Sequence, residues 1–88
     1  ETIADYYREH GMAALQHARA ALDAANLPYH YHISVGTPAE AIVQYANEQA
    51  VGQIVMSKQG HSDLQAMLLG SVVSKVLHLA ECPVLLVK

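Results

Sequence analysis

The most constraining feature of this 88-residue sequence is a pair of short apolar runs separated by a helical pattern. The runs cover residues 53–56 and 84–87, and apolar side chains recur at helical spacing from Ser71 to about Leu79. Continuous apolar runs are typical of strands covered on both faces. Strands that alternate with helices predict a parallel sheet with helices on its faces. We therefore predict an α/β fold with three layers, α/β/α.

Two further helices are predicted upstream of the first apolar run. The Ala-rich segment 5–25 has small and apolar residues at helical spacing, and Asn26 is expected to end it. Thr37-Pro38-Ala39-Glu40 predicts a helix start, with Thr37 as N-cap, Pro38 in the first turn and Glu40 completing a capping box. We expect this second helix to reach about residue 50 and to end at Gly52.

One further strand is predicted between these helices. Residues 29–35 alternate strictly, with Tyr29, Tyr31, Ile33 and Val35 on one face and His30, His32 and Ser34 on the other. This pattern predicts a half-exposed strand. The expected order of elements is therefore helix, strand, helix, strand, loop, helix, strand.

Composition narrows the class of protein. With 52% apolar and 15% charged residues the chain is expected to form one globular domain, residues 1–88. A net charge of −3 without a basic stripe argues against nucleic-acid binding. No apolar run reaches the roughly 20 residues that span a bilayer, so we expect no membrane partner and a cytoplasmic location. The lone Cys82 is expected to pack rather than react.

Glycines and a hydroxyl between a strand and a helix could hold a phosphate. Gly60 is followed by nine residues and then by Gly70-Ser71 at a predicted helix start. Glycine lets the backbone approach a ligand, and a helix N-terminus attracts anions. The alternative is a helix cap with two turn glycines. His61 could donate a hydrogen bond to a phosphate or lie in solvent.

Other candidate sites are weaker in this sequence. His30 and His32 share one strand face, but no third ligand stands at motif spacing, so no metal site is predicted. The sequence contains no recognisable pair of a nucleophile and a general base, and no pair of carboxylates suited to general acid–base catalysis. We therefore predict no catalytic residues.

Four segments together resemble a known family: residues 35–40, residues 54–56, the Gly60 to Gly70-Ser71 spacing, and residues 82–87. They are similar to the carboxy-terminal part of a universal stress protein domain, from its second helix to its fifth strand. The resemblance implies an adenine-nucleotide-hydrolase-like, nucleotide-binding fold with strand order 3-2-1-4-5, here lacking its first β-α-β unit. It favours a fragment of a longer protein, over strands supplied by another chain or paired differently.

The resemblance also implies a ligand and its site. ATP-binding members have a Gly-x2-Gly-x9-Gly-Ser/Thr motif, in which Ser57 here replaces the first glycine. The implied ligand is ATP or AMP, with any Mg²⁺ carried by the nucleotide. The residues expected at the site are Met56, Ser57, Gly60, His61, Gly70, Ser71 and Val72, with Met56 and Val72 packing on the nucleotide.

A regulatory role follows from the resemblance. It implies a stress-response protein that acts as a homodimer through antiparallel pairing of its last strand, Val84–Val87, with at most weak ATP hydrolysis or autophosphorylation. The alternative is a protein-interaction module of the same family, in which Ser57 marks the loss of nucleotide binding.

Overall fold

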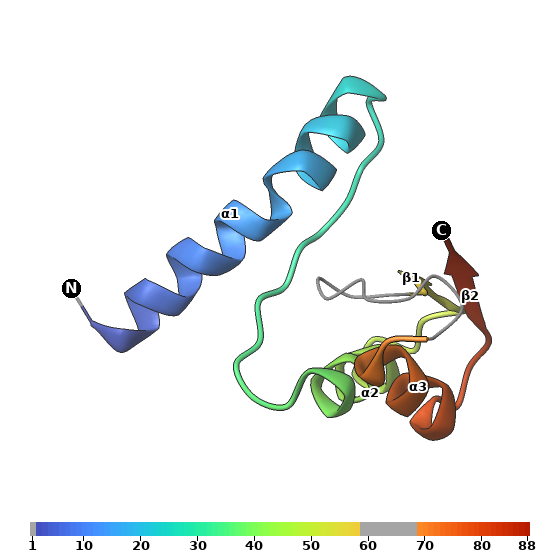
Figure 1. Ribbon diagram of the computed structural model, residues 1–88. Helices are drawn as coiled ribbons and strands as arrows, with labels where there is room; N and C mark the ends of the chain where they lie inside the picture. Colours follow the sequence, from blue (N-terminus) through green and yellow to red (C-terminus); the bar gives the residue numbers. More distant parts are fainter. Residues whose placement is uncertain (1, 59–68) are drawn as a thin grey trace. The chain divides into compact units, whose positions relative to one another are not determined.

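A computed structural model describes residues 2–58 and 69–88 and shows an α/β chain (Figure 1). Its elements are α1 (Ile3–Ala24), α2 (Pro38–Glu48), β1 (Ile54–Ser57), α3 (Ser71–Leu79) and β2 (Val84–Val87). Strands β1 and β2 pair in parallel, with Ile54 opposite Val84 and Ser57 opposite Val87. The prediction of an α/β fold with a parallel sheet is confirmed. The chain divides into two compact units, one ending at Val35 and the other beginning at Gly36.

Both ends of α1 are closed by local hydrogen bonds. The Thr2 hydroxyl accepts from the Asp5 amide at 3.1 Å, and the Asp5 carboxylate accepts from the Thr2 amide at 3.2 Å, which forms a capping box. At the other end Asn26 has a φ of 57°. The Leu27 amide then donates to the Leu22 carbonyl, five residues earlier, at 3.1 Å. This is the 6→1 hydrogen bond of a Schellman motif. The prediction that Asn26 ends this helix is confirmed.

The strand predicted over residues 29–35 is not formed. The segment runs back beside α1 as extended backbone, and no strand of the described residues pairs with it (Figure 1). Alternating side chains suit a strand, but a strand also needs a neighbour for its hydrogen-bond ladder. Ile33 is instead half-buried, and its side chain lies directly over Gly11 of α1.

An arginine also holds the returning segment to α1. The Arg19 guanidinium lies over the Tyr31 ring, with its central carbon 5.0 Å from the ring centroid. A hydrogen bond between the Arg19 side chain and Tyr29 raises the pKa of Arg19. Arginine is protonated well above neutral pH, so the group that faces Tyr31 is a cation at physiological pH.

Helix α2 begins as predicted, with Thr37 as N-cap and Pro38 in the first turn. The predicted capping box is wrong, because the Thr37 side chain makes no cap hydrogen bond. The Glu40 carboxylate instead forms an ion pair with Lys75 of α3, at 3.0 Å. The prediction that Gly52 ends α2 is also wrong: the helix closes two residues earlier, at Ala50, which has a φ of 51°.

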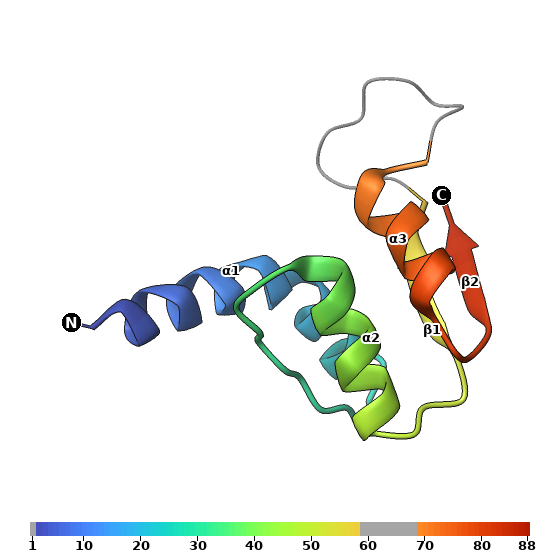
Figure 2. The ribbon, with the colours of Figure 1, turned by 90° about the horizontal axis from the view of Figure 1, so that it is seen from below.

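The core lies in the second unit, between its helices and its sheet. Its buried residues are Ala39, Val43, Ala46, Val73 and Val76, and Val76 is fully buried. Ile54, Met56 and Val84 pack against Ala39, Val43 and Val76 of this set from one face of the sheet. Figure 2 shows α3 beside the two strands. On the other, open face of the sheet, Val55 is 54% and Leu85 51% exposed among the residues that the structure describes. Among the described residues no helix is long and apolar enough to cross a membrane.

Candidate functional site

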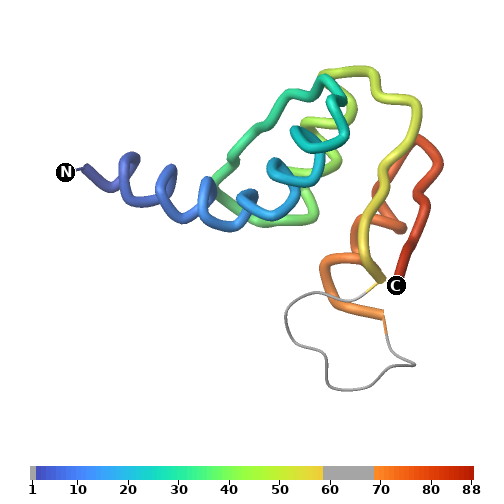
Figure 3. The backbone as a smooth tube through the Cα atoms, turned by 90° about the horizontal axis from the view of Figure 1, so that it is seen from above, coloured from blue at the N-terminus to red at the C-terminus, as the bar shows by residue number. Residues whose placement is uncertain are grey.

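The candidate site lies where β1 ends and α3 begins. The Lys58 amide donates to the Val87 carbonyl at 2.9 Å, which ties the end of β1 to the end of β2. The Lys58 carbonyl accepts from the Gly70 amide at 3.1 Å, which brings the start of α3 to the same place. Figure 3 shows the C-terminus, the end of β1 and the start of α3 at one end of the sheet. Ligands of open α/β sheets bind beyond this carboxyl edge.

The first turn of α3 carries donors without helical acceptors. Gly70 is the N-cap, with φ −64° and ψ 156°, and it has no side chain that could cap the helix. The first helical hydrogen bond runs from the Ser74 amide to the Gly70 carbonyl, at 3.0 Å. The amides of Ser71, Val72 and Val73 therefore have no acceptor within the helix. They form the positive end of the helix dipole and favour an anion there.

The structure brings only some of the predicted site residues together. Ser57, Gly70 and Ser71 lie at this end of the sheet, and both serines are exposed. Gly60 and His61 lie outside the described residues, so the predictions about them stay predictions.

The two apolar residues predicted to contact the nucleotide belong to the edge of the core. Met56 and Val72 are half-buried and pack against the cluster around Val76. Ser57 follows Met56 on the strand and is therefore directed to the opposite face of the sheet. A ligand at this edge would meet Val72 beside the first turn of α3.

Lys58 and Lys88 were missed by the sequence analysis. Each follows the last residue of a paired strand, and the amide bond from Lys58 to Val87 places Lys88 opposite Lys58 in the parallel register. The signal was present in the sequence, since each lysine directly follows an apolar strand. It could be read only once the register of the two strands was known.

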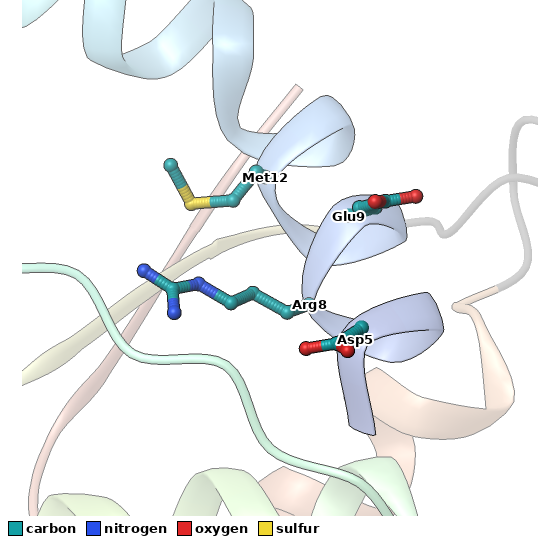
Figure 4. Close-up of a pocket in the computed structure, with 4 residues that line it drawn as sticks. All are labelled: Asp5, Arg8, Glu9 and Met12. Atoms are coloured by element: carbon teal, nitrogen blue, oxygen red, sulfur yellow. The ribbon is translucent and has the colours of Figure 1, made fainter. Parts of the chain in front are cut away.

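Two further surface depressions are lined by described residues. One is on α1 and is lined by Asp5, Arg8, Glu9 and Met12, with Arg8 and Met12 projecting to the same side of the helix (Figure 4). The second is lined by α2 residues and Leu79. Both are shallow surfaces formed mainly by one helix, and neither is lined by a predicted site residue.

Metal binding and cysteine chemistry have little support among the residues that the structure describes. Within residues 2–58 and 69–88, no three side chains of His, Cys, Asp or Glu gather closely enough to hold a metal ion. His30 and His32 are exposed. Cys82 is half-buried, with a free thiol.

Comparison with known proteins identifies relatives along the whole chain. The model of the universal stress protein family matches residues 2–88. The chain is 35% identical over 88 residues to universal stress protein MJ0531 of Methanocaldococcus jannaschii, covering 100% of this chain and 52% of the relative. It is 33% identical over 88 residues to universal stress protein YxiE of Bacillus subtilis, covering 100% of this chain and 60% of the relative. The chain thus spans between half and two thirds of these relatives.

Proposed function

Because this chain belongs to the universal stress protein family, we propose that it acts in the stress response by binding an adenine nucleotide, ATP or AMP. The proposed site is the carboxyl edge of the sheet, where β1 ends and α3 begins. The observation that supports it most is the hydrogen bond between Lys58 and Gly70, which holds the uncapped start of α3 at the end of β1. This arrangement offers backbone donors to an anion at the edge where α/β sheets bind ligands.

In this proposal each site residue has a distinct role. The phosphates accept hydrogen bonds from the first amides of α3 and from the Ser71 hydroxyl. Gly70 has no Cβ, so the phosphates can approach its backbone. Gly60 and His61 contribute from the loop, Met56 and Val72 pack on the nucleoside, and Ser57 contributes from the end of β1. Occupancy of this site then biases dimerisation or the recruitment of a partner.

Direct binding measurements test this function. Titrating the full-length protein with fluorescently labelled ATP is expected to give saturable binding. Ser71→Ala is expected to weaken it about tenfold, because the hydroxyl donates to a charged phosphate. The matched control is Ser74→Ala, an exposed serine one turn further along α3 that is expected to leave the affinity unchanged. Absence of saturable binding in the full-length protein would contradict the proposal.

The exposed apolar strand β2 favours a second candidate, an interaction module that assembles without nucleotide. Leu85 is 51% and Val87 44% exposed, and within the described residues β2 pairs with β1 alone. A strand of this kind needs cover, and antiparallel pairing of Val84–Val87 between two copies would supply it. Ser57 would then mark the loss of nucleotide binding.

Two measurements separate the candidates. If labelled ATP binds only after Ser57→Gly, the interaction module is the correct assignment for the natural chain. For the homodimer, Leu85→Lys is expected to shift the sedimentation of the full-length protein from dimer to monomer, since a charge disfavours edge pairing. Val55→Lys is the control, because Val55 lies beside Leu85 on the same open face but on β1. Equal loss of dimer in both variants would argue against pairing through β2.

A further inference from the structure

Two lysines stand opposite each other at the carboxyl edge of the sheet. The register that pairs Ser57 with Val87 continues by one residue, because the Lys58 amide donates to the Val87 carbonyl at 2.9 Å. An equivalent hydrogen bond lies at the start of the sheet. There Ile54 is opposite Val84, and its amide donates to the carbonyl of the preceding residue, Pro83, at 2.9 Å. Lys58 and Lys88 therefore occupy neighbouring positions of a parallel pair.

Both side chains continue the rows that face the helices. Along β1, Ile54 and Met56 are half-buried on that face, and Lys58 follows them in the same alternation and is itself half-buried. Along β2 the matching row is Val84, Leu86 and then Lys88. The Lys58 carbonyl also binds the Gly70 amide, so the row from β1 ends beside the first turn of α3.

Two other cations of the chain have their charges met by neighbouring side chains. Lys75 is paired with Glu40 at 3.0 Å, and Arg19 lies over the Tyr31 ring. In the part of the chain that the structure describes, no carboxylate forms an ion pair with Lys58 or Lys88. Like charges directly opposite each other in a sheet are destabilising. A bound anion would relieve this repulsion.

We propose that Lys58 and Lys88 bind the distal phosphates of the nucleotide and make the site prefer ATP over AMP; this rests on the function proposed above. The start of a helix offers only about half an elementary charge. That charge suits one phosphate, whereas a triphosphate brings several negative charges that need further cations. The lysine pair places two full charges at the same edge as that helix start.

The ratio of ATP to AMP affinity tests the lysine pair. Both nucleotides are titrated into the full-length protein, with EDTA present to keep them free of metal. The double variant K58Q/K88Q is expected to weaken ATP binding about tenfold, which is in the upper range for two charge pairs at a protein surface. It is expected to weaken AMP binding less than about twofold, because one phosphate is met by the helix start. Added salt should weaken ATP binding more in the parent protein than in this variant.

Two further variants separate a charge effect from a folding effect. K58R/K88R keeps both charges and is expected to keep the affinity ratio near that of the parent protein. Lys75→Gln removes one positive charge from the same unit and is expected to leave the ratio unchanged, because Lys75 is already paired with Glu40. Thermal melting confirms that every variant is folded.

The possible outcomes have different consequences for the two proposals. If ATP binds and K58Q/K88Q leaves the ratio unchanged, the role of the lysines is overturned while nucleotide binding stands. Equal weakening of ATP and AMP also overturns it, since the lysines would then serve no distal phosphate. If the parent protein binds neither nucleotide, the proposed function and this inference both fail.

Discussion

At the scale of single residues, Ala50 occupies a position that favours glycine. It ends α2 with a φ of 51°, its amide donates to the Asn47 carbonyl, and the Val51 amide donates to the Ala46 carbonyl, both at 3.2 Å. These bonds form a Schellman motif, whose left-handed residue is usually glycine. An L-residue in this conformation costs roughly 1–2 kcal/mol because its Cβ crowds the carbonyl oxygen.

Ala50→Gly is therefore expected to raise the free energy of unfolding by about 0.5–1 kcal/mol, less than the full cost because glycine also gains freedom in the unfolded chain. Urea denaturation of the full-length protein measures the change. Gly52→Ala is the control: its added Cβ would meet no atom within 4 Å, so an effect within about 0.5 kcal/mol is expected. A lower stability for Ala50→Gly would contradict the account of this helix end.

The C-terminal ends of α1 and α2 show which helix ends can be predicted from the sequence. Asn26 was predicted correctly because asparagine tolerates the left-handed conformation more readily than most residues. Ala50 was missed because alanine normally continues a helix, and the nearby Gly52 was the more obvious candidate. The last turn of α2 carries the buried Ala46, so this helix ends next to the core of the second unit.

At the scale of elements, Gly11 decides how closely residues 29–35 approach α1. A Cβ built at Gly11 would lie 2.7–2.9 Å from three side-chain carbons of Ile33, which is closer than such atoms approach. Ile33 is β-branched and has few alternative rotamers, so it cannot move away easily. Glycine inside a helix costs about 1 kcal/mol relative to alanine, and the close packing on Ile33 offsets this cost.

A double-mutant cycle tests this contact. Gly11→Ala alone is expected to change the free energy of unfolding little or to lower it, because the gain in helix propensity meets the clash with Ile33. In an Ile33→Ala background the same change is expected to stabilise by about 0.5–1 kcal/mol. Chemical denaturation of the four proteins gives the coupling energy. Equal effects in both backgrounds would show that Gly11 and Ile33 do not share a contact.

Elements set by local signals were predictable, and elements that need a distant partner were not. The helices and the apolar strands β1 and β2 follow from periodicity and composition along the chain. The strand over residues 29–35 failed because its pattern says nothing about a neighbour to pair with. Glu40 failed as a capping residue because Lys75, far along the chain, binds its carboxylate. The site edge was predictable from the order of elements, but Lys58 and Lys88 required the register.

At the scale of the whole molecule, the buried residues are concentrated in one of the two units. All of the buried hydrophobic residues that the structure describes lie between Ala39 and Val76, and α1 contributes none. Helices in proteins gain most of their stability from packing of an apolar face, and α1, with 22 residues, has no buried residue. The unit that begins at Gly36 should therefore be the more resistant to local unfolding.

Hydrogen exchange of the 88-residue chain, followed by mass spectrometry, measures this difference. We expect amides in α1 to exchange faster than those in α2 and α3, because opening α1 exposes little buried apolar surface. Val76→Ala removes two methyl groups from a fully buried site and is expected to cost about 2 kcal/mol of unfolding free energy.

The same variant tests whether the two units unfold independently. If they do, Val76→Ala should accelerate exchange in α2 and α3 and leave the rate in α1 unchanged, because destabilising one independent unit does not affect the other. Ser74→Ala, at an exposed position on the same helix, is the control that should change neither rate. If exchange in α1 also accelerates in Val76→Ala, the two units are energetically coupled, and the stability of α1 derives from the core of the second unit.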